Sequence, residues 1–357
     1  MRKNINLMLG TDPLGRGGIA SVASILIHSP LLTKFSFEYI TTHRNGNKMG
    51  IFIIYIRALL KICWITIHGK PGVAHFHMSS RGSFLRKYLI FLLCKFLGYK
   101  TLIHLHSGEF DKFYFRHRSG IIGRFARKLF VEADHVVVLG HFWKKWMEEN
   151  GFRKGSISIV YNPIDTDYRI SISKDRSILF LGRLTNNKGL SDLLNAMKLV
   201  IPLYPNCQLV LGGDGEMAFF KDLTMKLGLS ANVKFLGWVE GAEKTKLLSS
   251  SSIFVLPSYA EGFPVGIVEA MAHRMAIIAT SVGGVTDAIT SGTEGILISP
   301  GDVNGLAKEL IRLLNSKIEC EVFGEAAYNK FIDSFSSEKI LKQWQQIYED
   351  LLSDRRN

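Results

Sequence analysis

Two glutamates at a fixed spacing, Glu261 and Glu269, carry the clearest chemical signal in the sequence. The apolar run at 253–257 predicts a strand, so Glu261 should stand in the loop that follows it. Glu269 should lie on the next helix, which is otherwise apolar, and a carboxylate there requires a hydrogen-bonding partner. Carboxylates accept hydrogen bonds from paired hydroxyls. The pattern therefore indicates a binding site for a sugar or a ribose, rather than a helix-start acid with a surface glutamate.

Two cations follow another predicted strand, at 177–181. Arg183 comes just after that strand, and Lys188 stands at the predicted start of the next helix. An arginine fork, a mobile lysine and a helix N-terminus at one strand end would suit a diphosphate. From these residues alone, a solvated loop with surface charges remains the alternative.

A glycine-rich segment, 10–19, follows the first predicted strand and includes Gly17 and Gly18. Glycine lets backbone amides approach an anion closely, and a following helix adds its partial positive charge. The full G-x-G-x-x-G spacing is missing. Phosphate or acceptor contact and an ordinary strand-to-helix turn therefore both remain open.

The elements that would position these residues alternate along the chain. Short Val- and Ile-rich runs alternate with longer helical patterns, which is typical of parallel sheets with crossover helices. Strands are predicted at 5–9, 37–41, 73–77, 101–106, 135–139 and 156–161, and again at 177–181, 207–212, 233–236, 253–257, 276–279 and 295–298. Helices are predicted at 19–32, 50–67, 83–97, 120–132 and 141–150, and then at 189–203, 216–227, 243–249, 265–273, 303–314, 319–334 and 337–352.

The restart of this pattern predicts two doubly wound α/β domains, 1–165 and 166–336, with a polar linker at 162–175. A C-terminal helix at 337–353 could pack back on the first domain. Ligands of such sheets bind beyond the carboxyl ends of the strands. The expected site is therefore a groove between the two domains.

The composition indicates a large folded protein. The chain has 357 residues, more than twice the roughly 150 of a common domain. Its content of 47% hydrophobic and 21% charged residues argues against a disordered or fibrous protein. The four cysteines form no C-x-x-C pair, which fits a reducing cytosol. The first apolar run ends at Thr11, before a secretory signal would be complete.

Positive charge is concentrated in the first half of the chain. Residues 1–168 hold 24 Lys and Arg against 10 Asp and Glu, whereas residues 169–357 hold 20 against 21. Aromatic residues interleave with the basic ones at 84–96 and 113–118, which suits an anionic membrane better than nucleic acid. The apolar stretch 51–67 is shorter than the roughly 20 residues of a membrane span. We expect it to form a buried or interfacial helix.

Taken together, these residues resemble the retaining GT-B glycosyltransferases of glycosyltransferase family 4. The resemblance covers nearly the whole chain, and its motifs are specific in the second half. They are the strand exit from Gly182-Arg183 to Lys188-Gly189, the G-G-D-G at 212–215, the F-L-G-W at 235–238, Pro257-Ser258 and the E-x7-E of Glu261 and Glu269. The Y-N-P-I-D at 161–165 is similar to an interdomain N-G-V-D signature, with Pro163 in place of glycine.

The resemblance implies a role for each matching residue. Arg183 and Lys188 would neutralise the leaving diphosphate of a nucleotide sugar in place of a metal, so no metal or other cofactor is expected. Glu269 would hold the ribose, and Glu261 would hold the donor sugar. His106, in the H-L-H-S-G-E-F segment at 104–110, would lie beside that sugar, although the family's usual H-x-H-D is altered to Ser107-Gly108-Glu109. The other implied donor-binding residues are Gly17, Gly18, Gly237, Trp238, Val239, Gly262, Phe263 and Pro264.

These roles agree with the chemistry of glycosyl transfer, which builds negative charge on the departing phosphate and positive charge on the anomeric carbon. No clear nucleophile is present, which favours front-face attack over a covalent intermediate. We expect a sugar transferase with a lipid-linked or oligosaccharide acceptor of surface polysaccharide, peripheral at the cytoplasmic face of the cell membrane. A nucleotide-sugar epimerase of similar build and a non-catalytic basic adaptor for membrane or nucleic acid are the alternatives.

Overall fold

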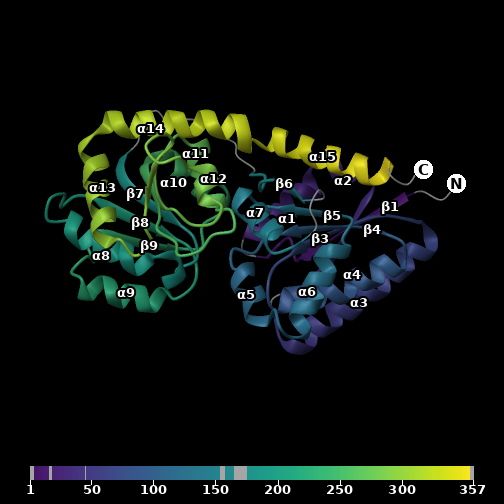
Figure 1. Cartoon of the computed structure of the whole chain (residues 1–357). Coiled ribbons are helices and arrows are strands. Elements are labelled where there is room, and N and C mark those ends of the chain that lie inside the picture. The colour runs from purple at the N-terminus through teal and green to yellow at the C-terminus, as the bar shows by residue number, and fades with distance from the viewer. Residues whose placement is uncertain (1–3, 16–17, 45, 153–156, 165–174, 354–357) are drawn as a thin grey trace. The chain divides into compact units, whose positions relative to one another are not determined.

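The computed structural model describes residues 4–15, 18–44, 46–152, 157–164 and 175–353. The chain divides into two compact units, shown in Figure 1. Unit 1 comprises Met1–Pro163 and Ser337–Asn357, and unit 2 comprises Ile164–Ser336. Most of the predicted linker, residues 165–174, lies outside the described residues.

Unit 1 is built on a parallel sheet of six strands in the order β2-β1-β3-β4-β5-β6. Neighbouring strands that are distant in sequence require crossover helices, as the alternating pattern predicted. The strands are β1 (Asn4–Thr11), β2 (Phe37–His43), β3 (Lys70–Met78), β4 (Lys100–Leu105), β5 (His135–Val138) and β6 (Ile157–Ile159).

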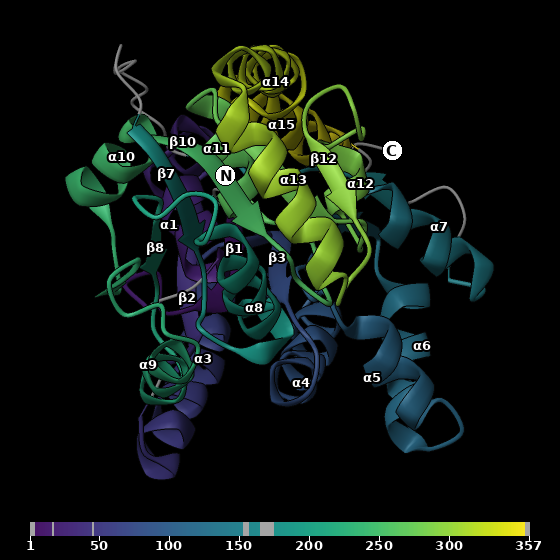
Figure 2. The same cartoon turned by 90° about the vertical axis from the view of Figure 1, so that its left-hand side faces the viewer.

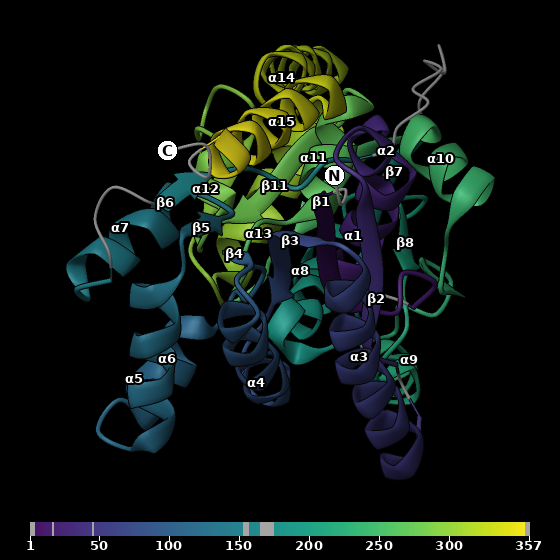
Figure 3. The same cartoon turned by 90° about the vertical axis from the view of Figure 1, so that its right-hand side faces the viewer.

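Helices cover both faces of this sheet, with α3 and α4 on one face and α15 on the other (Figure 3). Residues alternate between the faces, so Ala74 and Phe76 of β3 pack toward α3 and α4, whereas Val73 packs toward α15. The helices of unit 1 are α1 (Gly18–His28), α2 (Pro30–Lys34), α3 (Lys48–His68), α4 (Gly82–Phe96), α5 (Phe110–His117), α6 (Ile121–Glu132), α7 (His141–Glu149) and α15 (Ser337–Ser353).

Unit 2 repeats the plan with a second parallel sheet, in the order β12-β11-β10-β7-β8-β9. Its strands are β7 (Asp175–Leu181), β8 (Gln208–Gly212), β9 (Val233–Gly237), β10 (Ser251–Leu256), β11 (Ala276–Thr280) and β12 (Ile296–Ile298). The prediction of two doubly wound parallel sheets is therefore confirmed.

The helices of unit 2 pack in pairs around its sheet. Helix α8 lies beside α13, and α11 lies beside α14 (Figure 2). These helices are α8 (Leu190–Val200), α9 (Met217–Lys226), α10 (Gly241–Ser250), α11 (Val265–Ala272), α12 (Val285–Ala288), α13 (Val303–Asn315) and α14 (Lys317–Lys330).

Three local features differ from the sequence prediction. The first predicted helix is split at Pro30 into α1 and α2, because proline starts a helix readily but breaks a helix interior. Helices α5 and α12 were not predicted. Both are short, at eight and four residues, and a pattern over so few residues does not establish a helix.

Helix α3 is mainly exposed, which excludes the first alternative of the expected buried or interfacial helix at 51–67. Only Ala58, Ile62 and Ile65 are buried among its 21 residues, while Leu60 and Trp64 face solvent. Among the described residues, α3 is the one helix long and apolar enough to cross a membrane, which by itself is weak evidence. The expectation of an interfacial helix stays a prediction.

The C-terminal helix α15 completes the core of unit 1. Trp344 and Tyr348 are fully buried and pack beside Val73 of β3 and Leu102 of β4. Tyr348 also binds His75 of β3, with the hydroxyl 2.8 Å from Nδ1. Residues 337–353 therefore stabilise a sheet that is distant in sequence.

Removing the Trp344 side chain should destabilise unit 1. Truncating a buried tryptophan to alanine typically costs about 3–5 kcal/mol. We therefore expect Trp344→Ala to speed hydrogen exchange of the β3 and β4 amides, measured by mass spectrometry, while unit 2 amides stay protected. Gln343→Ala, at an exposed position of α15, is the matched control. Equal protection of β3 in both variants would contradict this role of α15.

Candidate active site

The strongest candidate site lies at the carboxyl edge of the unit 2 sheet, where β7 and β10 are neighbours. After β7 the chain forms a short 3₁₀ turn, Asn186–Lys188, before α8 begins. Lys188 Nζ lies 2.6 Å from Glu261 Oε1, which belongs to the loop after β10. The structure therefore brings together two residues predicted from separate motifs.

Glu261 is held by more than Lys188. The Ser258 hydroxyl donates a hydrogen bond of 2.7 Å to the same Oε1 atom. The Glu261 side chain is only 8% exposed, whereas that of Lys188 is 26% exposed. A carboxylate with two donors on one oxygen is fixed in orientation, and its other oxygen can accept from a ligand.

Glycines allow the loops of this site to meet. Gly189 has φ +69°, and a Cβ there would lie 1.9 Å from the carbonyl oxygen of Pro257. A Cβ on Gly283, which follows β11, would lie 1.9 Å from the carbonyl oxygen of Glu261. A larger residue at Gly189 would push the Lys188 turn away from the loop after β10, and one at Gly283 would push the loop after β11 away from Glu261.

Glu269 lies on α11, and it is buried as the sequence predicted. Its partner in the structure is Lys244 of α10, with Nζ 2.6 Å from Oε1. Burial raises the pKa of Glu269 above its usual value, and the charge of Lys244 partly opposes that shift. The prediction of a buried carboxylate that needs a partner is correct, but the partner was not identified from the sequence.

Arg183 is set apart from these pairs. Its side chain is 71% exposed, and its Nε lies 3.7 Å from Asp214 Oδ1 in the loop after β8. The contact is loose, and exposed pairs of this kind contribute about 0–1 kcal/mol. The structure therefore places Arg183 at the same edge of the sheet but not against Lys188 or Glu261.

The remaining predicted donor residues of unit 2 lie in two segments. Gly237 ends β9, with Trp238 and Val239 directly after it, and the Gly213 amide donates to the Gly237 carbonyl at 2.6 Å. The Trp238 indole donates to Glu240 Oε2 at 2.7 Å.

The second segment leads into α11. Gly262, Phe263 and Pro264 connect Glu261 to that helix, and Phe263 is buried against Phe335. This segment directly follows Glu261 in the chain and therefore lies beside its ion pair with Lys188.

His106 belongs to unit 1 and follows β4 directly. It is half-buried, and its Nε2 lies 2.9 Å from His77 Nδ1. Burial, then the charges of His77 and Lys87, lower the pKa of His106 well below its usual value.

Gly18 begins α1, and nothing lies within 4 Å of where a Cβ would stand. Gly17 lies outside the described residues.

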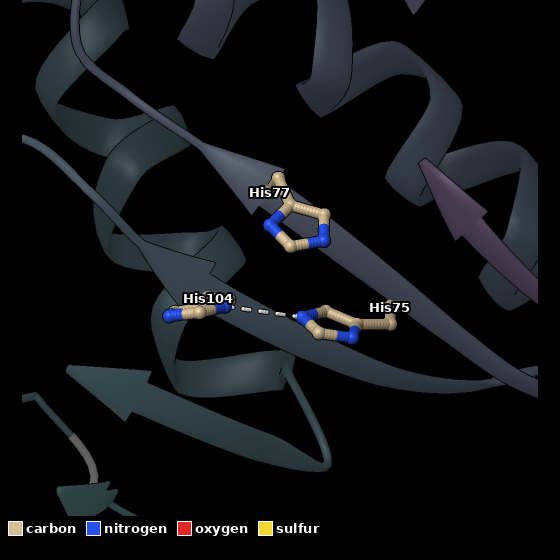
Figure 4. A group of neighbouring side chains, drawn as sticks. All are labelled: His75, His77 and His104. Atoms are coloured by element: carbon tan, nitrogen blue, oxygen red, sulfur yellow. Dashed lines mark hydrogen bonds between the residues drawn. The ribbon is translucent and has the colours of Figure 1, made fainter. Parts of the chain in front are cut away.

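Three further histidines are buried beneath α15 in unit 1 (Figure 4). One ring nitrogen from each of His75, His77 and His104 lies within 4.8 Å of the others, a spacing that a metal ion could bridge. His75 Nε2 already lies 3.3 Å from His104 Nδ1, and His75 Nδ1 bonds the Tyr348 hydroxyl. Burial lowers the pKa of all three, to about 3 for His77. The three rings are therefore neutral and buried, and in the described part of the chain His77 Nε2 and His104 Nε2 have no hydrogen-bond partner.

The raised pKa of Glu269 gives a pH prediction. Because the folded carboxyl group holds its proton to a higher pH than the unfolded one, stability falls as pH rises from the usual glutamate pKa to the raised value. Glutamine does not titrate. The melting temperature of Glu269→Gln relative to the native protein should therefore rise across that range.

Scanning calorimetry from pH 4 to pH 8 would measure the difference. Glu321→Gln, an exposed residue of α14, is the control and should follow the native protein at every pH. A constant difference between Glu269→Gln and the native protein would contradict the burial effect.

The chain matches two known protein families, and the two matches together cover most of its length. Residues 167–330 match the family described as glycosyl transferases group 1, and residues 25–168 match glycosyltransferase family 4. The first match contains all the ion-paired residues of unit 2, and the second contains His106.

Individual relatives are more distant. The chain is 30% identical to an exopolysaccharide phosphotransferase of Streptomyces coelicolor, over 62% of this chain and 24% of that protein. It is 31% identical to an N-acetyl-alpha-D-glucosaminyl L-malate synthase of Bacillus anthracis, over 63% of this chain and 62% of that protein. The matches therefore span less than two thirds of these relatives' own lengths.

A solved structure supports the fold. The HepE protein of Anabaena in complex with UDP-glucose superposes with a TM-score of 0.77 at 20% identity, over 97% of this chain and 99% of that one. With both family matches and this architecture, the chain belongs to the GT-B glycosyltransferases of family 4.

Proposed function

We propose that this glycosyltransferase takes a sugar from a nucleotide-sugar donor and transfers it, with retention of configuration, to a lipid-linked or growing surface polysaccharide. The observation that carries the proposal is the pairing of Lys188 with the buried Glu261 at the carboxyl edge of the unit 2 sheet. This pair offers a positive charge for a phosphate beside a carboxylate for sugar hydroxyls. The related HepE fold with UDP-glucose supports a nucleotide-sugar donor.

The donor would bind along this edge of the sheet. Lys188 has three N–H donors, so it can hold Glu261 and a diphosphate oxygen together. Arg183, now loosely paired with Asp214, can exchange that carboxylate for the diphosphate. Glu269 would accept from the ribose hydroxyls through Oε2, while Oε1 holds Lys244. The segment 237–239 would flank the base.

The reaction would need no metal ion. Negative charge develops on the leaving phosphate, and preorganised cations there lower the barrier without reorganisation. Front-face attack would let that phosphate take the proton of the acceptor hydroxyl. His106, neutral because of its lowered pKa, would offer a hydrogen bond to the donor sugar rather than a second positive charge.

Removing Lys188 tests this assignment. After a thermal-shift screen of UDP, GDP, ADP and their sugars has identified the donor, Lys188→Ala should lower turnover by about 10² to 10³. Nucleotide release measures that turnover, and free epimerised nucleotide sugar without release would favour an epimerase instead. Lys198→Ala, an exposed lysine of α8, is the control.

Because Lys188→Ala also leaves Glu261 with one donor fewer, Lys188→Arg serves as a second variant that keeps the charge. Recovery of part of the activity in Lys188→Arg would support the electrostatic role. Full activity in Lys188→Ala would contradict it.

We also propose that unit 1 binds the cytoplasmic face of an anionic membrane. Helix α3 exposes a row of apolar side chains, including Phe52, Leu60 and Trp64, and α4 adds Leu89 and Phe96. These residues lie within residues 1–168, which is the basic half of the chain. An apolar face flanked by lysine and arginine is the pattern of an interfacial helix.

Liposome flotation tests the membrane proposal. The protein should float with phosphatidylglycerol vesicles at low salt and much less with neutral vesicles, and Trp64→Glu should weaken that binding. Met225→Glu, on α9 of unit 2, is a matched control, because its exposure of 64% is close to the 61% of Trp64. Equal flotation with neutral and anionic vesicles would remove the membrane proposal and leave the transferase proposal standing.

A further inference from the structure

A buried lysine of unit 1 has no acidic partner in the described part of the chain. Lys87, in the second turn of α4, is only 4% exposed, and the hydrogen bond of its Nζ goes to the Ser83 hydroxyl at 2.9 Å. Buried lysines are normally paired with a carboxylate. A buried lysine without one tends to lose its proton, and an anion bound beside it would hold it in the charged form.

Other basic groups surround Lys87. Burial, followed by the charge of Arg86, lowers the pKa of Lys87 to about 7. Burial and then the charges of Arg86 and Lys87 lower the pKa of His43, which ends β2. The charge of Lys87 also contributes to the lowered pKa values of His77 and His106, which lie at the ends of β3 and β4. Two cationic side chains, Arg86 and Lys87, and three histidines with lowered pKa values therefore gather at the carboxyl edge of the unit 1 sheet, and we call these five residues the basic cluster.

Nearby acidic residues are bound to other cations. Asp12, after β1, pairs with Arg44 at 2.6 Å. Glu109, after β4, pairs with Lys112 at 3.4 Å and with Arg81 at 3.9 Å. Within the described ranges, no ion pair joins Arg86 or Lys87 to a carboxylate. The positive charge of the basic cluster is therefore not neutralised by these acids.

The basic cluster is partly exposed. Ser83, Arg86, His43 and His106 are half-buried, while Lys87 is buried. The cluster also lies at the start of α4, a helix of 15 residues whose N-terminus carries a partial positive charge. Cations, a hydroxyl and a helix N-terminus in one place are suited to a phosphate group.

We propose that the basic cluster, with Lys87 at its base, binds the phosphate or diphosphate group of the acceptor. The acceptor part of this statement rests on the proposed transferase function, whereas the anion site itself does not. Phosphate could also come from an anionic lipid headgroup or from the donor nucleotide, so the test separates these sources.

Direct binding of inorganic pyrophosphate is the first measurement. Titration calorimetry of the full chain should detect binding, and Lys87→Met should weaken it by roughly tenfold to a hundredfold. Methionine matches the lysine stem in shape and removes the buried charge, so the variant should be at least as stable as the native protein. Arg86→Gln, a half-exposed position, should also weaken binding.

Lys95→Met is the matched control, because Lys95 lies on the same helix but pairs with Glu132 on its exposed side. It should leave pyrophosphate affinity unchanged. Loss of stability in Lys87→Met with unaltered pyrophosphate affinity would overturn the proposal and make Lys87 a packing residue. Failure of the native protein to bind pyrophosphate would overturn it as well.

Two further arms identify the source of the phosphate. Phosphatidylglycerol vesicles that bind in a Lys87-dependent manner more tightly than pyrophosphate would point to a headgroup and overturn the acceptor assignment. UDP affinity should be the same in Lys87→Met and the native protein, and a loss would assign the cluster to the donor instead.

A polyprenyl diphosphate sugar should show a raised KM in Lys87→Met, while hydrolysis of the donor without acceptor stays unchanged. An unaltered KM for this acceptor would overturn the acceptor assignment. Absence of donor turnover in the native protein would instead count against the proposed function, and pyrophosphate binding would still decide the anion site.

Discussion

The candidate site of unit 2 depends on close backbone contacts at Gly189 and Gly283, which leave no room for a side chain at either position. A Cβ at Gly189 or Gly283 would lie 1.9 Å from a carbonyl oxygen of the Glu261 loop or of the residues just before it. These contacts hold the loops after β7, β10 and β11 at fixed distances, so Lys188 and Glu261 meet at 2.6 Å without support from a ligand. A site held in this way is preorganised, because little conformational freedom remains to be lost when substrate binds. Such preorganised charges act on a transition state at little reorganisation cost.

Much of the fold could be predicted from the sequence, because each strand contains a short apolar run between longer helical patterns. All twelve predicted strands are present, and the runs 253–256 of β10 and 276–279 of β11 are hydrophobic and buried throughout, as parallel strands covered on both faces must be. The exposure of α3 could not be predicted. Its apolar residues encircle the helix, and periodicity alone does not state which neighbours cover it. The sheet covers only the side with Ala58, Ile62 and Ile65.

Part of the site could be predicted, because a buried charged group requires a bonding partner. A carboxylate within the apolar α11 signalled that Glu269 must be bound, but nothing in the sequence marked Lys244, which precedes it by 25 positions on an ordinary polar helix. Lys188 and Glu261 were each placed after a predicted strand, where ligands of parallel sheets bind, but nothing in the sequence showed that β7 and β10 are neighbours. The direction of Arg183 could not be predicted either, because a side chain that is 71% exposed is steered by local partners such as Asp214.

The two units differ in how their buried charged groups are partnered. Unit 2 pairs each buried carboxylate of its site with one lysine, so the ammonium groups can turn to a phosphate while the carboxylates accept from hydroxyls. Unit 1 buries Lys87 among other bases, and the acids near them are engaged elsewhere. A buried ion pair compensates its own charges, whereas a lone buried lysine loses its proton or needs an anion beside it. On the proposals above, unit 2 would bind a ligand that carries both phosphate and hydroxyls, and unit 1 would bind an anion.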